Sequence, residues 1–345
     1  MVAFRTRFAE YCGFCKDICT APEHSRGSYI LLTNTWNEAP LIPGLFERMS
    51  KQSKLPRSWV WIDDGSTDAT AQVLKETAAK YPQLQLWVES MPKKKTPNFF
   101  TLGKSHERVL LKLRSRIDAL GADYLAVLDP DTEPCPNYFA RLCSILDSDH
   151  GLGAVAGYPV QEPDKLKSGR PMNSGKMIRW SIVREIDKFW DYCPDSFYNL
   201  KAESRGYRVG VVKVPVSLDR PTTAVTSREG AFRQGRLYYY ARRPVWAILL
   251  RSVWRQITRQ HGDDLLRGYL VEMRRGTWKC DDPDVVRYYG AGKGPVVEVL
   301  AALHLLTSAV RSASFRSGSR NRQPTSLGRA RSSASTVPKR RRTQS

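Results

Sequence analysis

The sequence predicts an α/β fold, in which a mainly parallel sheet carries helices on both faces and is followed by a helical region and a basic tail. Short apolar runs alternate with segments of helical periodicity through the first 128 residues. Several of these runs end abruptly at a polar or acidic cluster. Such alternation is typical of parallel sheets, because parallel neighbours are joined by crossover helices.

The expected elements follow from the spacing of apolar residues. Four buried strands are predicted at residues 29–33, 58–62, 84–88 and 124–128. Helical spacing predicts helices at residues 43–51, 73–78 and 104–120. In the second half we expect a strand at 153–160, a helix around 176–190 and an amphipathic helix at 244–259.

Composition divides the chain into four segments. Residues 312–345 carry nine Lys or Arg and no Asp or Glu, in a background of Ser, Gly, Thr and Pro that cannot bury a core, so we expect a disordered basic tail. We place a Cys-containing extension at 1–27, the sheet domain at 28–225 and a helical region rich in basic and aromatic residues at 226–311.

The chain is strongly basic and its partners are expected to be anionic. Removing the nine charges of the tail from the formal +21 leaves +12 on the rest. This surplus attracts phosphates, nucleic acid or acidic lipids without choosing among them. A hydrophobic fraction of 41% with 26% charged residues is ordinary for a globular protein and excludes disorder of the whole chain.

The sequence favours a cytoplasmic protein, with at most a peripheral position at the inner face of the cell membrane. The first 20 residues lack the apolar core of a signal peptide. No uncharged apolar run reaches about 20 residues, and the longest candidate, 295–310, contains Glu298 and His304. Seven cysteines, an odd number in a chain of this size, favour reduced thiols.

Polar clusters follow three of the predicted strands: Asn37-Glu38, Asp63-Asp64 and Asp129-Pro130-Asp131. Ligands of such sheets bind at the carboxyl ends of the strands, so we expect the clusters to share one crevice. Two carboxylates separated by one residue can direct oxygens at one hard cation, and a diphosphate can complete its coordination. A solvated Asp-Pro turn is the alternative for the third cluster.

The motifs together resemble the GT-A fold glycosyltransferases of family 2. The resemblance lies in Thr35-Trp36-Asn37-Glu38-Ala39, Ile62-Asp63-Asp64-Gly65-Ser66-Thr67-Asp68 and Leu128-Asp129-Pro130-Asp131, in that order. Pro194-Asp195, followed by Leu200-Lys201 and Gly206-Tyr207-Arg208, is similar to the family's Glu-Asp motif and its downstream Gly-Tyr. The resemblance covers residues 29–214, with a looser echo at 235–240 and 268–270.

The resemblance implies a donor site that takes a UDP-, GDP- or dTDP-linked sugar. Its nucleotide-sugar-binding residues would be Thr35, Asn37, Glu38, Asp64 and Asp129. Asp64 would meet the nucleobase, and Asp129 the ribose or the metal. Asp131 would be the principal ligand of Mn²⁺ or Mg²⁺. Helix capping by Ser66, Thr67 or Asp68 is the alternative role of the second cluster.

Asp195 would be the general base, which takes the proton of the acceptor hydroxyl as its oxygen attacks opposite the departing nucleotide. Inversion of configuration follows. The metal would offset charge on the diphosphate. Pro194 stands where the family usually has Glu, which puts the base in doubt. A surface carboxylate is the alternative for Asp195, and Asp191 is the nearby substitute.

These features predict an inverting, hexosyltransferase-like enzyme of cell-surface glycan or glycolipid synthesis, acting on a glycan or lipid-linked acceptor. Two alternatives stay open: a metal-dependent nucleotidyltransferase, and an inactive GT-A scaffold whose basic tail binds polyanions. Nucleic acid is not the expected partner.

Further features have two interpretations each. One interpretation of Arg233, Gln234 and Arg236 is that they bind donor phosphates. The other is that they pack over the amphipathic helix at 244–259. That helix is also suited to lie on an anionic membrane surface. Near the N-terminus, three cysteines and a histidine are spaced closely enough to form a zinc site: Cys12, Cys15, Cys19 and His24. The alternative is that these cysteines are unpaired thiols.

Overall fold

The computed structural model describes residues 25–94, 102–162, 166, 170–192, 194–220 and 227–291. These residues belong to one compact unit that ends at Gly294. The basic tail and the expected zinc ligands Cys12, Cys15, Cys19 and His24 lie outside the described residues. The boundary between the sheet domain and the helical region, placed between residues 225 and 226, stays a prediction.

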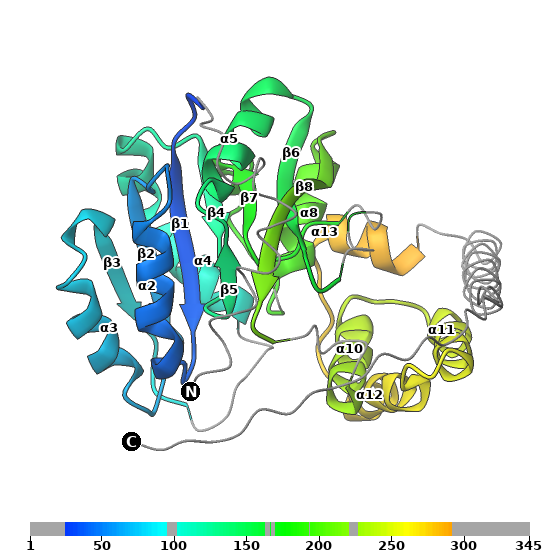
Figure 1. The fold of residues 1–345 in the computed structure, drawn as a ribbon. Coiled ribbons are helices and arrows are strands. Elements are labelled where there is room, and N and C mark those ends of the chain that lie inside the picture. The colour runs from blue at the N-terminus through cyan, green and yellow to red at the C-terminus, as the bar shows by residue number, and fades with distance from the viewer. Residues whose placement is uncertain are drawn as a thin grey trace, which may run out of the picture. The chain divides into compact units, whose positions relative to one another are not determined.

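The described strands form one eight-stranded sheet in the order β3-β2-β1-β4-β7-β6-β8-β5 (Figure 1). The pairs β1–β2, β1–β4, β2–β3 and β6–β8 are parallel, and the other three are antiparallel. The strands are β1 (Tyr29–Thr35), β2 (Ser58–Asp63), β3 (Leu86–Ser90), β4 (Tyr124–Val127), β5 (Thr132–Pro134), β6 (Leu152–Pro159), β7 (Lys176–Arg179) and β8 (Arg208–Leu218). The predicted α/β class is confirmed.

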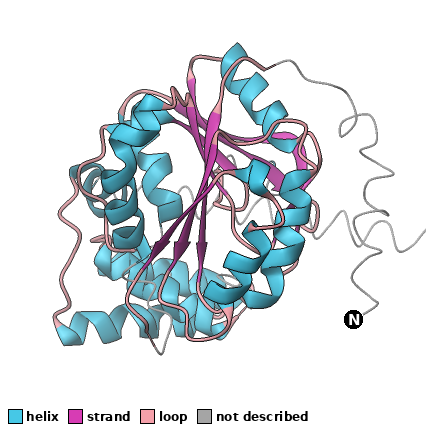
Figure 2. Ribbon diagram, turned by 90° about the vertical axis from the view of Figure 1, so that its left-hand side faces the viewer, coloured by secondary structure: helices cyan, strands magenta, loops and turns pink. Residues whose placement is uncertain are grey.

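Helices cover both faces of the parallel part of the sheet, because β1 sends alternate apolar side chains to opposite sides (Figure 2). Ile30 and Leu32 pack in one core with helix α4 (Leu102–Ala119). Tyr29 and Leu31 pack in a second core. That core also contains residues of α2 (Ile42–Ser50), α3 (Thr70–Ala78) and α5 (Tyr138–Ser148). The buried strands are therefore apolar at successive positions, as the sequence indicates.

The prediction of a helix around residues 176–190 is wrong for the first part of that range. Lys176–Arg179 forms β7, antiparallel to both β4 and β6, and only Trp180–Arg184 is helical, as α7. The cause is packing, because Met177 and Ile178 point to opposite faces and fill the two cores between the neighbouring strands. A strand with two apolar residues between charged ends has too short a pattern to be recognised.

Helix α8 (Pro194–Ser204) precedes β8, and 3₁₀ turns lie in the first half of the chain at η1 (Ala39–Leu41) and η2 (Pro82–Leu84). After β8 the described chain is helical, as predicted for the C-terminal region. Its elements are α10 (Arg228–Tyr240), α11 (Val245–Ile257), α12 (Gly262–Arg275), α13 (Pro283–Val285) and the π-helix η3 (Val286–Ala291). Helices α10 and α12 touch closely, since a Cβ on Gly235 would lie 2.0 Å from the carbonyl oxygen of Leu265. The predicted helix at 244–259 is α11.

Within the part of the chain that the structure describes, no helix combines the length and the apolar character that crossing a bilayer requires.

Candidate active site

A cavity of about 190 Å³ lies at the carboxyl ends of β1, β2 and β4. Its lining residues are Asn34, Trp36, Glu38, Asp64, Lys94, Leu102, His106, Val127, Asp129 and Asn173. Each of the three polar clusters singled out in the sequence contributes one carboxylate, namely Glu38, Asp64 and Asp129. The parallel strands thus bring these side chains to one place, which is the common location of ligand sites in α/β sheets.

Thr35 and Asn37 hold the loops around this cavity and are not among its lining residues. The Thr35 hydroxyl donates to the carbonyl oxygen of Ile62 at 3.2 Å and accepts from the Trp61 indole N–H at 2.8 Å. Asn37 has a left-handed backbone, with φ of 55°, and its Oδ1 accepts from the Thr67 backbone N–H at 2.8 Å. Both side chains therefore tie the loop after β1 to β2 and the loop that follows it.

The adjacent carboxylates Asp63 and Asp64 have different hydrogen-bond partners and different roles. Asp63 Oδ1 accepts from the Ser66 backbone N–H at 3.0 Å and so closes the turn after β2. Asp64 is buried, lines the cavity, accepts from the Ser105 hydroxyl at 2.8 Å and forms an ion pair with Lys94. Asp64 is the carboxylate that a ligand in the cavity can reach.

Asp129 lies among carboxylates that raise its pKa. Burial, then the negative charges of Asp195 and Asp131, raise the pKa of Asp129 to about 8, while Lys176 and Arg220 act in the opposite direction. Like charges in a poorly solvated site disfavour ionisation of each other. A cation entering this site would therefore relieve repulsion between carboxylates that already interact.

Arg220 bonds to two carboxylates of the candidate site, Asp131 and Glu38. The sequence did not indicate this arginine. Its Nε donates to Asp131 Oδ2 and its Nη2 donates to Glu38 Oε1, both at 2.8 Å. The side chain stays 55% exposed. Arg220 follows β8, so it connects the end of that strand with the loops after β1 and β4. An arginine 182 residues from Glu38 in the chain gives no local sequence signal.

Asp195 is held at the start of α8 beside a buried cation. Pro194 is the first residue of the helix, a position that proline tolerates because the first helical N–H groups have no partner within the helix. The Lys176 ammonium is buried, donates to the Asp195 carbonyl oxygen at 2.6 Å and lies 3.8 Å from Asp195 Oδ1. That Oδ1 is buried and has no hydrogen-bond partner among the described residues.

His106 connects α4 to the helix that carries Asp195. Its Nδ1 lies 2.9 Å from the hydroxyl of Tyr198, three residues after Asp195. Both rings are buried, and burial lowers the pKa of His106 to about 3, so the imidazole is neutral. His106 also lines the cavity. A lone histidine inside an amphipathic helix carries no motif, so the sequence did not indicate this contact.

Two asparagines present unused polar atoms at the cavity. Asn34 Nδ2 and Asn173 Oδ1 are buried, and neither has a hydrogen-bond partner within the described part of the chain. Both residues line the cavity. Buried amide groups without partners are rare, and a bound polar ligand is one way to satisfy them. Neither residue belongs to the predicted site.

Metal binding by protein side chains alone is not supported. Across the described ranges, no three His, Cys, Asp or Glu side chains converge in a way that would hold a metal ion. Asp129 and Asp131 supply two carboxylates of the hard type that Mn²⁺ and Mg²⁺ accept. Further ligands would have to come from a bound anion or water.

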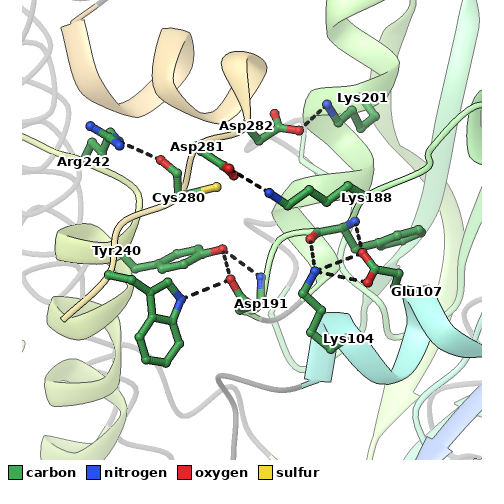
Figure 3. Close-up of polar contacts among 12 residues, drawn as sticks. Lys104, Glu107, Lys188, Asp191, Lys201, Tyr240, Arg242, Cys280, Asp281 and Asp282 are labelled. Atoms are coloured by element: carbon green, nitrogen blue, oxygen red, sulfur yellow. Dashed lines mark hydrogen bonds and ion pairs between the residues drawn. The ribbon is translucent and has the colours of Figure 1, made fainter.

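Asp191 lines a second cavity, of about 620 Å³, which does not include Asp195 among its lining residues. Its Oδ2 accepts from the Tyr240 hydroxyl at 2.8 Å and from the Trp278 indole N–H at 3.2 Å (Figure 3). The Tyr240 hydroxyl in turn accepts from the Asp191 backbone N–H. These bonds connect Asp191 to α10 and to the segment before α13, so the structure gives the substitute base a packing role.

The wall of this second cavity contains paired charges. Lys104 donates to Glu107 and to the Phe189 carbonyl oxygen, and Lys188 pairs with Asp281 at 2.7 Å (Figure 3). Two of the lysines in this wall, Lys104 and Lys188, are therefore already engaged with protein oxygens.

Comparisons with known proteins give matches in structure only. No protein-family model matches the sequence, and no curated protein matches it. Mannosyltransferase PcManGT from Pyrobaculum calidifontis, solved with GDP-Man and Mn²⁺, is similar over 90% of this chain and 87% of its own, with 16% identity and a TM-score of 0.48.

Two further solved structures are similar over a smaller part of this chain. S. aureus TarS with UDP-GlcNAc matches 60% of this chain and 65% of its own, with 16% identity and a TM-score of 0.43. Glucosyl-3-phosphoglycerate synthase from Mycobacterium tuberculosis, with Mn²⁺, UDP and glucosyl-3-phosphoglycerate, matches 60% of this chain and 78% of its own, with 15% identity and a TM-score of 0.44. The structure resembles GT-A-type glycosyltransferases. A likeness this distant describes the chain path and carries no activity with it.

Proposed function

We propose that this protein transfers a sugar from a nucleoside-diphosphate sugar to an acceptor hydroxyl, with inversion, as a hexosyltransferase-like member of glycosyltransferase family 2. The observation that carries the proposal is the interaction of Asp129 with both Asp131 and Asp195 at the edge of one cavity. This interaction supports the proposal that a carboxylate pair suited to a metal and diphosphate acts together with a carboxylate suited to proton transfer.

The nucleotide end of the donor would occupy the cavity. Asp64 would accept a hydrogen bond from a ring N–H of the base, which uracil, thymine and guanine all carry. Its oxygens are fixed by Ser105 and Lys94, so the carboxylate is oriented before the ligand arrives. Glu38, Asn34 and Asn173 would bind ribose or sugar hydroxyls, with Thr35 and Asn37 holding the loops. A UDP-, GDP- or dTDP-linked sugar fits these groups.

Asp129 and Asp131 fit a divalent cation, Mn²⁺ or Mg²⁺, by the chemistry of their oxygens. The metal, when bound, would offset the negative charge of the departing diphosphate. Asp131 Oδ2 now accepts from Arg220, so a metal at that oxygen requires the guanidinium to move. Arginine binds phosphate oxygens well, which gives Arg220 an alternative partner once the donor is present.

Asp195 would take the proton of the acceptor hydroxyl. Its buried Oδ1 accepts no hydrogen bond from the described residues, and Lys176 fixes the backbone beside it. Pro194 at the first position of α8 is compatible with this arrangement. With the leaving diphosphate held on one face of the sugar, attack from the other face inverts the anomeric centre.

The acceptor would be a glycan or a lipid-linked sugar of cell-surface synthesis, and the enzyme would work in the cytoplasm at the inner face of the membrane. In the described part of the chain the buried thiols of Cys143 and Cys280 belong to no disulfide, which is typical of a reducing compartment. The nucleotidyltransferase alternative would require a second nucleotide or phosphate substrate. The inactive-scaffold alternative predicts no turnover of any donor.

Calorimetric titration of UDP, GDP and dTDP in the presence of Mn²⁺ tests the donor half of the proposal. We expect one of them to bind wild type, Asp131→Ala to weaken that binding at least tenfold, and Asp195→Asn to leave it within about twofold, because Asp131 is assigned to the metal and Asp195 is not. Turnover of the matching sugar nucleotide should fall at least 100-fold in Asp195→Asn. Failure of all three nucleotides at millimolar concentration would contradict the proposal.

A further inference from the structure

Helix α11 has its apolar face turned to solvent. Five aliphatic side chains on it are exposed, with exposed fractions from 41% to 67%: Val245, Leu249, Leu250, Val253 and Ile257. On the same helix the buried residues are Ala247, Ile248, Ser252 and Arg255. The buried face is therefore mixed, and most of the large apolar side chains face solvent, whereas the apolar stripe of an ordinary surface helix faces the core.

The exposed residues form one continuous stripe. At 100° per residue the five aliphatic side chains span an arc of about 140°, in which Trp246 is a further apolar member and Gln256 the only polar one. Clusters of exposed apolar residues mark sites that contact another molecule. We name this surface, formed by Val245, Trp246, Leu249, Leu250, Val253 and Ile257, the α11 stripe.

Packing against the neighbouring helices fixes this orientation. The Arg255 guanidinium donates to the Gln234 side-chain oxygen on α10. At the C-terminal side, a Cβ on Gly262 would lie 1.9 Å from the Ser252 carbonyl oxygen, so α11 and α12 touch backbone to backbone. Rotating α11 to bury its stripe would break both contacts, and the exposure is therefore built into the fold.

Charge indicates what covers the α11 stripe. Between residues 230 and 262 the chain has seven Arg and no Asp or Glu. Arg242 and Arg259, at the two ends of α11, are exposed. A second copy of this face would bring like charges together. Residues 292–345 carry eleven Lys or Arg against one Glu, so they are repelled as well. An anionic lipid surface complements both the apolar stripe and its basic ends.

We infer that α11 docks on anionic membranes, with the α11 stripe in the boundary between headgroups and acyl chains and the flanking arginines at the phosphates. The inference deepens the membrane location given under the proposed function, and the binding itself requires neither sugar transfer nor a metal. It assigns the membrane contact to a defined surface. Its consequence for the proposed function is an acceptor presented at that same membrane.

Flotation of the full chain with vesicles tests the inference. We expect binding to vesicles of phosphatidylcholine containing about 30% phosphatidylglycerol, at least tenfold stronger than to phosphatidylcholine alone and weaker at high salt. The variant Val253→Glu with Ile257→Glu should lose at least tenfold in binding, because two carboxylates enter the stripe. Both sites are exposed, so the fold tolerates the change.

A matched control separates the stripe from the net charge. Val88→Glu with Leu111→Glu adds the same two charges on β3 and α4, at residues that are 47% and 39% exposed, and should bind like wild type. Equal loss in both variants, or no loss in either, would mean that the basic residues bind without the stripe and would overturn the inference. A dimer of wild type that dissociates in the Val253→Glu, Ile257→Glu variant, seen by light scattering without lipid, would overturn it in favour of a second copy.

Discussion

At the scale of single residues, Asp129 concentrates the electrostatics of the site. Its carboxyl combines burial with two like-charged neighbours, Asp195 and Asp131, and its pKa is raised to about 8. The apo protein therefore holds a proton there at neutral pH. Burying a carboxyl beside like charges lowers the stability of the fold, and groups with strongly shifted pKa values are common at functional sites.

Replacing Asp129 by Asn should stabilise the protein more at high pH than at low pH. The folded pKa lies above the ordinary value of 3.8, so the stability linked to this proton is complete below pH 4 and is lost as pH rises through 8. Asn cannot ionise and avoids that loss. We expect the difference in free energy of unfolding between variant and wild type to grow by roughly 4 kcal/mol from pH 4.5 to pH 9, because each pH unit below the folded pKa of about 8 removes about 1.4 kcal/mol.

Urea unfolding at both pH values measures this difference. Asp187→Asn, at a side chain that is 86% exposed, serves as the control and should give a nearly constant difference. A difference that stays constant from pH 4.5 to pH 9 would show that Asp129 is ionised throughout the range.

At the scale of elements, α8 depends on two contacts that the sequence did not reveal. Lys176 on β7 bonds to the first turn of the helix, and His106 on α4 meets Tyr198 one turn later. Both contacts link segments far apart in the chain. The strands β1, β2 and β4 were predictable because their apolar runs are continuous and end in polar clusters. Strand β7 was not, because only Met177 and Ile178 carry its pattern.

Lys176→Met should separate turnover from donor binding. Lys176 touches Asp195 and is not among the residues lining the donor cavity, so we expect kcat to fall at least tenfold while the KM for the donor changes less than threefold. Loss of the hydrogen bond from the Lys176 ammonium to the Asp195 carbonyl oxygen should also lower stability by about 1.5 kcal/mol. Steady-state kinetics and urea unfolding measure the two effects.

The matched control for Lys176→Met is Lys112→Met, which removes an exposed ion pair with Glu89. It should leave both kinetic constants within twofold, because surface ion pairs contribute about 1 kcal/mol or less. An unchanged kcat in folded Lys176→Met would remove Lys176 from the positioning of the base.

At the scale of the whole molecule, the site is closed by parts of the chain that are distant in sequence. Glu38, Asp131 and Arg220 come from three separate segments, and the guanidinium holds both carboxylates. The sequence located the two carboxylates, since each follows a strand in a recognisable motif. It did not locate the cation, because an arginine after a long strand in a chain of net charge +21 is one among many.

Arg220→Gln should alter metal binding and donor binding in opposite directions. Without the guanidinium, Asp131 loses a competing cation, so Mn²⁺ alone should bind at least threefold more tightly. Binding of the nucleoside diphosphate with Mn²⁺ should weaken at least threefold, because a phosphate partner is lost. Arg208→Gln, at the other end of β8 and paired with Asp149, should change neither. Weaker binding of Mn²⁺ alone to Arg220→Gln would mean that Arg220 organises the carboxylates for the metal, and that it does not compete with it.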